Sequence, residues 1–568
     1  DQLYNQEFEK FIEYNRQDVM LLARLDKKLR FIDLANQMAH ENTVLIPNTL
    51  GAVAMTEQAI INEAHGLGLI VPNRKNHADT KAAGAYVAYP KKGLHDWIGT
   101  IDIKSLYPSA IRALNMGPET LVGQLRQTMT DKYINGRMLK NNKIKDELFA
   151  KAWEGLFASL EYTAVMERKQ EVEITIDWED GTETTLTAKQ IWSLIFEGDN
   201  EWVLSANGTI FRIDKIGIIP GLLDRWYAER KDLQKKLAEA LAAGDEAEIE
   251  FWDKRQLVKK INLNSLYGAL LNAGCRFFDK RIGQSTTLTG RSIAKHMAGY
   301  VNDVITGVKD HTGKSIIYGD TDSVLFSAWP MVRDQVESGD LKWTKESCIE
   351  LYDSITDKVN DSFPPFMEES FNCPYKLGSI IKGSREITGT KGLFITKKRY
   401  AILVYDKEGK RYDTNGSTGY VKAMGLDLRR SDTPKIVQDF LSRILRNLLD
   451  GVPRDDIIQN IIDFKETFLS RPAWEKGTPK RVNNLTKFDS MEKEKGKANM
   501  PGHVRASINW NTMRKMNSDQ HSLEISDGQK VIVCVLKPNV IGYTSISYPI
   551  DQIYLPQWFK ELPFDENE

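Results

Sequence analysis

The sequence predicts a multidomain α+β protein, and three observations support that fold class. The chain has 568 residues, enough for three to four domains at roughly 150 residues each. Hydrophobic residues make up 41% of it and charged residues 27%, as in ordinary globular proteins. Segments with helical periodicity alternate with short segments typical of strands. We therefore expect several buried cores, and a wholly disordered or fibrous protein is excluded.

Composition also argues against membrane-spanning, disulfide-stabilised and zinc-binding proteins. No stretch approaches the roughly 18 apolar residues of a membrane-spanning helix, and the strongest apolar run, residues 531–536, has the length of a strand. The four cysteines lie tens of residues apart, which suits neither a disulfide framework nor a zinc site and favours a reducing, cytoplasmic setting. The net charge is −1, so any surface that binds a polyanion must be local.

The first part of the chain contains both helical and strand signals. Residues 1–40 have helical periodicity, and residues 98–103 form an apolar strand pattern before a turn at 104–108. Residues 172–213 alternate as in strands, and we assign them no function. The chain starts at Asp1, without an initiator methionine or a signal-peptide pattern, so we expect it to be part of a longer protein.

The strongest local signal is a pair of helices. Residues 222–243 and 246–270 have helical patterns separated by Gly244 and Asp245, a stop followed by an N-cap. The pattern predicts an antiparallel hairpin whose arms are roughly 33 Å long, at about 1.5 Å per residue. We also expect helices at 288–306 and 434–449, strands within 394–412, and a mobile lysine-rich loop at 491–502.

Two segments carry carboxylates in positions that suit metal chemistry. Asp102 ends the strand at 98–103, before a turn in which the Ser105 and Leu106 amides could face an anion. Asp320 and Asp322 lie two residues apart on a tight hairpin at 318–323. Carboxylates from neighbouring strands are what two-metal phosphoryl transfer requires, with Mg²⁺ as the natural ion. The alternative for Gly-Asp-Thr-Asp alone is an ordinary turn.

The helical hairpin carries cations in a pattern that suits a triphosphate. Lys260, Asn264 and Tyr267 share one face of the second helix. Folding the hairpin brings Arg230 level with Lys260. The alternative is a solvated helix face, but Gly268 next to Tyr267 would also permit close approach of a ligand.

A third cluster is basic and lies on an expected strand. Residues 396–400 read TKKRY, and residues 380–435 hold 13 Lys and Arg against 6 Asp and Glu, a net of +7. This asymmetry predicts a footprint for a nucleic-acid backbone. A surface strand kept soluble by its charge is the alternative.

Together these segments resemble the ordered motifs of family B DNA polymerases. The four motif segments are DIKSLYPS, KKINLNSLYG, YGDTDS and TKKRY. The flanking segments GAYVAYP, MGPET and KAMGLDLRRSDTPK are most similar to the replicative polymerases of T-even-type bacteriophages. The resemblance runs from about residue 10 to about residue 515, and four motifs in order are highly specific.

The resemblance implies a right-hand architecture of palm, fingers and thumb that copies a DNA template onto a primer 3′ end. It divides the chain into the end of a 3′ to 5′ exonuclease domain (1–30), a return segment of an N-terminal domain (31–74), palm (75–216 and 273–425), fingers (217–272) and thumb (426–568).

The resemblance also assigns roles to single residues. The catalytic set is Asp102, Asp320, Asp322 and Lys260. Two Mg²⁺ ions, replaceable by Mn²⁺, would be held by Asp102, the Ile103 carbonyl and Asp322, with Asp320 and Glu386 in auxiliary roles. The deoxynucleoside triphosphate would meet Arg230, Lys260, Asn264 and the amides of Ser105 and Leu106. Tyr107 would exclude the ribose 2′-hydroxyl, Tyr267 and Gly268 would line the nascent base pair, and Lys397, Lys398, Arg399 and Tyr400 would contact the primer-template.

Four features depart from the family pattern. Gln234 stands where a second fingers cation is common, with Lys231 and Lys235 beside it, and the hairpin is shorter than in T-even enzymes. Tyr14 and Asp18 resemble the third exonuclease motif, but the first two would precede Asp1, so we expect no complete proofreading site in this chain. Residues 551–568 contain no convincing clamp-binding peptide.

We therefore predict a replicative phage-type DNA polymerase with primer-template DNA and deoxynucleoside triphosphates as substrates. A separate exonuclease-bearing chain and a sliding clamp are candidate partners, a membrane is not, and the expected location is the cytoplasm of a phage-infected bacterium. The main alternative is a non-catalytic primer-template binder that needs a partner chain. A reverse transcriptase or RNA polymerase is a third reading, because those enzymes also use paired aspartates.

Overall fold

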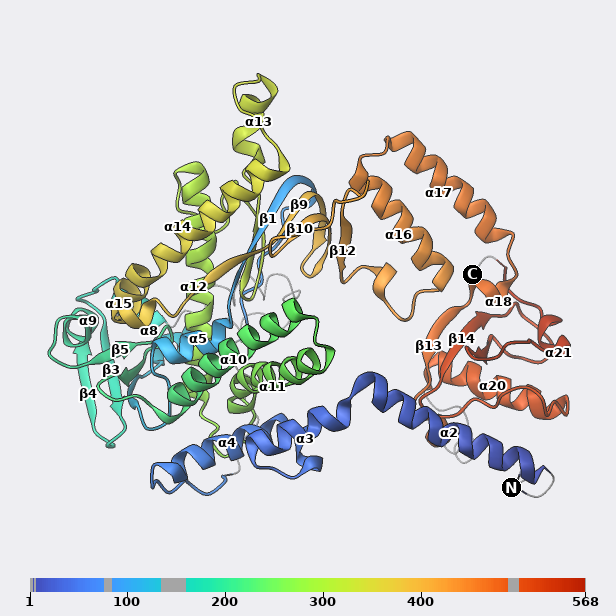
Figure 1. Cartoon of the computed structure of the whole chain (residues 1–568), viewed down its shortest axis with the longest axis horizontal. Helices are drawn as coiled ribbons and strands as arrows, with labels where there is room; N and C mark the ends of the chain where they lie inside the picture. Colours follow the sequence, from blue (N-terminus) through green and yellow to red (C-terminus); the bar gives the residue numbers. More distant parts are fainter. Residues whose placement is uncertain (1–3, 5–6, 76–83, 134–159, 489–499, 567–568) are drawn as a thin grey trace. The chain divides into compact units, whose positions relative to one another are not determined.

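The computed structural model describes residues 4, 7–75, 84–133, 160–488 and 500–566 (Figure 1). By its internal contacts the chain divides into two compact units. The first comprises Asp1–Ala88 and Thr100–Glu386, and the second comprises Tyr89–Gly99 and Ile387–Glu568. Most of the loop expected at 491–502 lies outside the described residues. The finer division into exonuclease end, palm, fingers and thumb stays a prediction.

The first unit begins with helices α2 (Phe8–Leu29), α3 (Phe31–Asn42) and α4 (Ala52–Gly66), with a 3₁₀ turn at Ile46–Leu50 between α3 and α4. The sequence predicted continuous helical periodicity over residues 1–40. The structure instead has a break at Arg30, whose φ of 53° lies in the left-handed region and ends α2. Helix α2 buries none of its residues.

The expected helical hairpin is confirmed as α10 (Ile218–Ala243) and α11 (Glu246–Leu270). Gly244 adopts a φ of 71° at the turn, a conformation that glycine accepts without strain. The Asp245 carboxylate accepts the amide N–H groups of Ala247 and Glu248 at 3.0 and 3.1 Å. Figure 1 shows the hairpin beside α3 and α4, where Val258 of α11 packs on Met38 and Met55.

The centre of the first unit is built from strand ends and long helices. Strands β7 (Ile316–Asp320) and β8 (Ser323–Phe326) form the expected hairpin, and β1 (Gly93–Ile103) ends beside it. Helix α5 (Leu106–Ala113) follows β1 directly. Helix α12 (Lys280–Thr306) packs on β7, β8 and α5, and α14 (Lys345–Phe371) packs on α12. Two shorter helices, α13 (Trp329–Glu337) and α15 (Tyr375–Gly378), complete this region.

A five-stranded antiparallel sheet confirms the strand-rich prediction for residues 172–213. Its order is β4-β3-β2-β6-β5, and the strands are β2 (Leu121–Leu125), β3 (Glu173–Trp178), β4 (Glu183–Thr187), β5 (Trp202–Leu204) and β6 (Thr209–Arg212). Helices α8 (Leu160–Met166) and α9 (Ala188–Phe196) share its apolar core. Helix α9 starts with a capping box in which Thr187 and Gln190 bond reciprocally.

The second unit contains a β-hairpin with two helices and, after them in the sequence, a second module of strands and helices. Strand β10 (Arg399–Lys407) pairs with β9 (Gly383–Thr396), β11 (Lys410–Arg411) and β12 (Tyr420–Met424), and a 3₁₀ turn (Asp427–Arg429) precedes α16 (Lys435–Asp450) and α17 (Arg454–Leu469). The module pairs β13 (Thr478–Arg481), β14 (Lys530–Val535) and β15 (Ser545–Pro549) with helices α18 (Ala473–Lys476), α20 (Gly502–Met516) and α21 (Gln557–Lys560). Trp510 and Phe559 are fully buried in its core. In the described part of the chain, no helix has the length and apolar character to cross a bilayer.

Candidate active site

The aspartates of the second motif lie on a very tight turn between β7 and β8. Asp322 donates its amide N–H to the Asp320 carbonyl at 2.7 Å, across Thr321, whose φ is 61°. A β-branched residue with positive φ is a true outlier, and such strain costs of order 1–3 kcal/mol. The Thr321 amide donates to the Tyr86 carbonyl at 2.8 Å. Surrounding bonds therefore hold Asp320 and Asp322 on one short turn.

The first-motif aspartate lies beside this turn. The amide of Ile103, the residue after Asp102, donates to the Asp322 carbonyl at 2.8 Å, and the Lys104 amide donates to the Lys382 carbonyl at 2.9 Å. Asp102, Asp320 and Asp322 are all half-buried. The structure thus brings together the backbones of two segments that are more than 200 residues apart in the sequence.

The oxygen atoms gathered here have the chemistry of a site for hard cations. Asp320 already accepts the hydroxyls of Tyr318 and Thr321 at 3.2 and 3.0 Å, which suits an auxiliary role. Glu386 is half-buried on β9. Among the described residues, no three His, Cys, Asp or Glu side chains form a ready-made metal cluster. Carboxylate oxygens are the ligands that Mg²⁺ prefers, and such ions usually take further oxygens from phosphate and water.

The start of α5 offers backbone donors next to the carboxylates. Ser105, its N-cap residue, has a φ of 51° and makes no side-chain capping bond. The first amides of a helix have no partner within the helix. The amides of Ser105 and Leu106 lie at this helix start, and their binding of an anion stays a prediction.

Two tyrosines from different motifs stack on each other. The Tyr107 and Tyr267 rings have centroids 4.3 Å apart and an interplanar angle of 30°, and the Tyr267 hydroxyl is hydrogen-bonded to that of Thr287. A Cβ at Gly290 would lie 3.0 Å from the Tyr107 ring, so glycine leaves room for the tyrosine there. Burial raises the pKa of both phenols, and in Tyr107 the carboxylates of Asp322 and Asp320 add to the effect.

The residues expected to meet a triphosphate lie on the two helices of the hairpin, and those on α11 share an exposed face. Lys260, Asn264 and Gly268 are exposed at steps of four residues on α11. Arg230 of α10 is half-buried, and its Nε–H has no acceptor among the described residues. Burial lowers the pKa of its guanidinium, and such a cation would gain from an anionic ligand. Gln234, Lys231 and Lys235 are exposed on α10.

In the second unit the basic motif forms the tip of the β9–β10 hairpin. Lys398 is exposed at the turn with a φ of 59°, and the Lys397 ammonium lies 3.9 Å from the centre of the Tyr89 ring. Tyr400 stacks on Phe394, with centroids 5.3 Å apart. Arg399 pairs with Asp427 at 2.7 Å. That pair is exposed and contributes at most about 1 kcal/mol, so phosphate could displace it.

Tyr14 and Asp18 are both exposed on α2, one helical turn apart and therefore on one face. Their assignment to an exonuclease site stays a prediction.

Some residues that support these side chains were not predicted from the sequence. Gly290 and Thr287 of α12 hold the two tyrosines, and Lys259 is buried in an ion cluster under the hairpin. No local pattern marks the first two. The sequence contains two consecutive lysines, Lys259 and Lys260, but it does not indicate which of them is buried.

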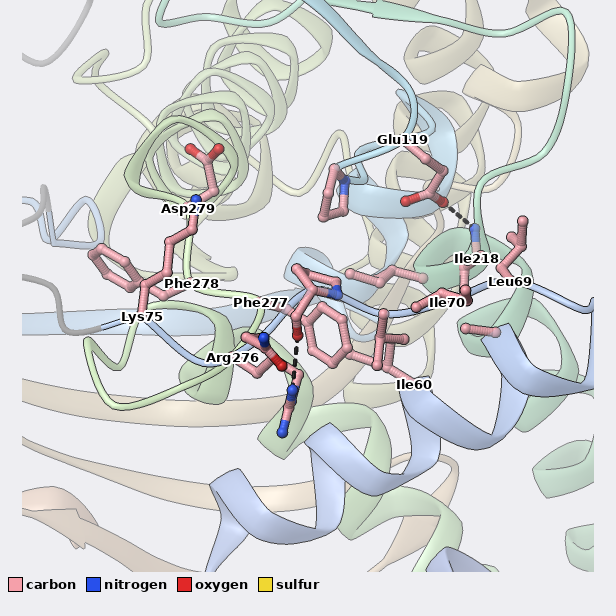
Figure 2. A pocket seen from close by; sticks show the side chains of 16 residues that line it. Ile60, Leu69, Ile70, Lys75, Glu119, Ile218, Arg276, Phe277, Phe278 and Asp279 are labelled. Atoms are coloured by element: carbon pink, nitrogen blue, oxygen red, sulfur yellow. Dashed lines mark hydrogen bonds between the residues drawn. The ribbon is translucent and has the colours of Figure 1, made fainter.

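A separate apolar cavity of about 590 Å³ lies at the base of the hairpin (Figure 2). Its walls include Ile60 of α4, Ile70, Ile218 at the start of α10 and Phe277. Glu119 on its edge accepts the amide of Ile218, which fixes the start of α10. None of the residues expected to act on a nucleotide lines this cavity, so it is distinct from the carboxylate site.

The chain is similar in sequence to known DNA polymerases. The model of DNA polymerase family B matches residues 49–338. The chain is 27% identical to a DNA-directed DNA polymerase of Enterobacteria phage T4 and 25% identical to that of Escherichia phage RB69, in each case over 95% of the chain and 59% of the relative. It is 27% identical to a DNA polymerase of Paramecium bursaria Chlorella virus NY2A, over 77% of the chain and 38% of that protein. The chain thus spans less than two thirds of the phage relatives.

The matched residues include both carboxylate motifs, the helical hairpin and the two stacked tyrosines. They make up half of the chain. By this match the chain belongs to DNA polymerase family B.

Proposed function

We propose that this chain is a template-directed DNA polymerase of the replicative phage type, which adds deoxynucleotides to a primer 3′ end. The observation that carries the proposal is the meeting of Asp102 with the strained Asp320–Asp322 turn. A purely structural turn has no need of several carboxylates on adjacent backbone segments, since like charges repel. Two-metal phosphoryl transfer does need them.

The cofactor would be two Mg²⁺ ions, or Mn²⁺ in their place, held by Asp102, Asp322 and the Ile103 carbonyl, with Asp320 and Glu386 nearby. When bound, these ions would lower the pKa of the primer 3′-hydroxyl and neutralise the leaving pyrophosphate. No side-chain nucleophile is needed, because protein groups contribute positioning and charge stabilisation in phosphoryl transfer.

The chain's own residues would hold and select the nucleotide. Arg230 and Lys260 would bind the triphosphate, with Asn264 and the amides of Ser105 and Leu106 completing its contacts. The stacked ring of Tyr107 would block a ribose 2′-hydroxyl. Tyr267 and Gly268 would border the nascent base pair, where the missing side chain of Gly268 leaves open space.

Primer-template DNA would contact the tip of the β9–β10 hairpin through Lys397, Lys398, Arg399 and Tyr400. Exposed cations on one hairpin suit a phosphate backbone. Tyr14 and Asp18 would belong to a 3′ to 5′ exonuclease site. An exonuclease-bearing chain and a sliding clamp are proposed partners, and the cytoplasm of a phage-infected bacterium is the proposed location.

The test is primer extension by the purified chain with Mg²⁺ and four deoxynucleotides, beside the Asp322→Asn variant. We expect extension by the native chain and a loss of about two orders of magnitude or more in the variant, because one metal ligand is neutralised. Asp357→Asn, an exposed position on α14, is the matched control and should extend normally.

Equal extension by Asp322→Asn would contradict the assignment of the site. If neither protein extends but both shift a primer-template in a gel, the non-catalytic binding function is favoured. Adding the exonuclease-bearing half would then show whether a missing subunit explains the lack of activity.

A further inference from the structure

On the helical hairpin, charged residues that form ion pairs adjoin cations that form none. Arg230 and Lys260 have no carboxylate partner in the described part of the chain. Their immediate sequence neighbours, Glu229 and Lys259, form an ion pair with each other. One cation of each helix thus has no carboxylate partner among the described residues, while the adjacent residue of each helix is paired within the protein.

The internal pair is part of a cluster in which Lys259 is buried and its partners are partly exposed. Lys259 is only 10% exposed and pairs with Glu229 of α10 and with Glu41 of α3. Arg225 of α10 pairs with Glu63 of α4 at 2.7 Å and reaches Glu229 at 3.9 Å. Three carboxylates and two cations therefore tie both arms of the hairpin to α3 and α4.

Removal of Lys259 would leave two carboxylates without their main partner. A buried or half-buried carboxylate that loses its cation is strongly disfavoured and recruits another positive group where one is in reach. Arg230 adjoins Glu229 and Lys260 adjoins Lys259 in the sequence, and both have long side chains without a carboxylate of their own. Arg230 and Lys260 are therefore the cations that the unpaired carboxylates would attract.

Helix α11 also couples the position of Lys259 to that of Lys260. Adjacent residues on a helix point about 100° apart, so a residue anchored under the hairpin sets the direction of the next one. Lys259 is anchored from both sides, and Asn262, one turn later, exchanges hydrogen bonds with Asn42 of α3 at 3.2 and 3.0 Å. These contacts fix the rotation of α11 that leaves Lys260 and Asn264 on the open face.

We propose that Lys259 is a positioning residue for nucleotide binding: it neutralises Glu41 and Glu229 so that Arg230 and Lys260 stay free for a triphosphate. This inference rests on the proposed function. Lys259 does not touch the nucleotide itself, because its ammonium is buried against the two carboxylates.

The test is steady-state incorporation of one deoxynucleotide, with KM and kcat measured separately. Lys259→Met should raise the nucleotide KM by about tenfold and change kcat by less than about twofold. Lys259→Arg should keep the native KM, because it keeps the charge. The triple variant Lys259→Met, Glu41→Gln, Glu229→Gln should return KM to within about twofold of the native value, because no stranded carboxylate remains.

A role in packing alone would give the opposite result for the triple variant, whose KM would stay as high as that of Lys259→Met or rise further. That result would overturn the proposal. If Lys259→Met does not fold, the uncharged triple variant still decides the question by its KM. Asp33→Asn is the matched control, since Asp33 of α3 pairs with Lys254 of α11 at 3.2 Å in an exposed position, and it should leave KM unchanged.

Lys260→Ala separates this inference from the proposed function. If Lys260→Ala raises KM and Lys259→Met does not, the positioning role is wrong and the nucleotide assignment stands. If neither raises KM in an active enzyme, the assignment of the hairpin face to the triphosphate is wrong as well.

Discussion

Helix α11 has one exposed face and one face that is buried against α3. One face carries Lys260, Asn264 and Gly268, which are exposed. The other carries Lys259 and Asn262, which are buried and bonded to α3. The same residue types, lysine and asparagine, thus occur on both faces.

The difference teaches that residue type and spacing do not by themselves identify a functional side chain. The buried lysine and asparagine have their hydrogen-bonding and charge requirements met within the protein. In the described part of the chain, no carboxylate or amide pairs with the exposed Lys260 and Asn264. A ligand could supply the missing partners. Matched substitutions on the two faces can therefore break or sharpen the comparison.

The largest effect is expected at the open cation. Lys260→Ala should lower kcat/KM for a complementary deoxynucleotide by about 100-fold, because a charge held against the triphosphate is lost. The melting temperature should stay within about 1 °C of the native value, since an exposed lysine contributes little stability. Single-turnover incorporation and thermal unfolding check the two parts. A large loss of stability with unchanged kcat/KM would reverse the roles given to the two faces.

The next effect contrasts two asparagines on the same helix. Asn262→Ala should destabilise the protein by about 1–3 kcal/mol, because the buried Oδ1 of Asn42 loses its donor. Asn264→Ala should change stability by less than about 0.5 kcal/mol and should instead weaken nucleotide binding. Denaturant unfolding and nucleotide KM, measured on both variants, test this. The comparison fails if both variants have the same profile.

Burial of a polar group also predicts a pH effect on α12. Burial, with Lys309 adding, lowers the pKa of His296 to about 3, and its Nε2 is 2.9 Å from the Ser362 hydroxyl on α14. Below the unfolded value of about 6.5 the unfolded chain takes up a proton that the folded chain refuses. Stability should therefore fall as pH drops from about 6.5 toward 3, by about 2 kcal/mol at pH 5.

His296→Gln should lose this part of the pH dependence. The measurement is the difference in unfolding free energy between native protein and variant at pH 7 and pH 5, which cancels the other titrating groups. A difference that does not change with pH would contradict a buried neutral histidine.

The smallest effect is expected behind the tyrosine stack. Gly290→Ala would place a methyl group 3.0 Å from the Tyr107 ring, so the ring must shift by a few tenths of an ångström. Discrimination against ribonucleotides should fall by about two- to fivefold, and much further in Tyr107→Ala, which removes the ring. Competitive incorporation of matched deoxy- and ribonucleotides checks both. Unchanged selectivity in Tyr107→Ala would refute its role as a sugar gate.

Several elements were predictable from sequence because their signals are local. The hairpin follows from helical periodicity, with Gly244 at the stop and Asp245 as the cap. The strand at 98–103 and the turn at 318–323 follow from apolar runs and turn residues. The meeting of Asp102 with Asp322 was expected from the order of motifs in a known family, not from any local pattern.

Other features depend on packing between distant segments and could not be predicted. Lys259 is buried because Glu41, 218 residues away in the sequence, lies under it. Gly290 matters because the Tyr107 ring packs on it. The break at Arg30 has no sequence signal, since arginine is a good helix former and adopts the left-handed conformation only where tertiary structure imposes it.

The most direct measurement of the central claim is incorporation on four primer-templates that differ only in the templating base, each offered one deoxynucleotide at a time with Mg²⁺. If the carboxylates of Asp102 and Asp322 act with the open face of α11 as proposed, only the complementary nucleotide extends each primer efficiently. Extension that ignores the templating base, or that survives Asp322→Asn, would contradict the account.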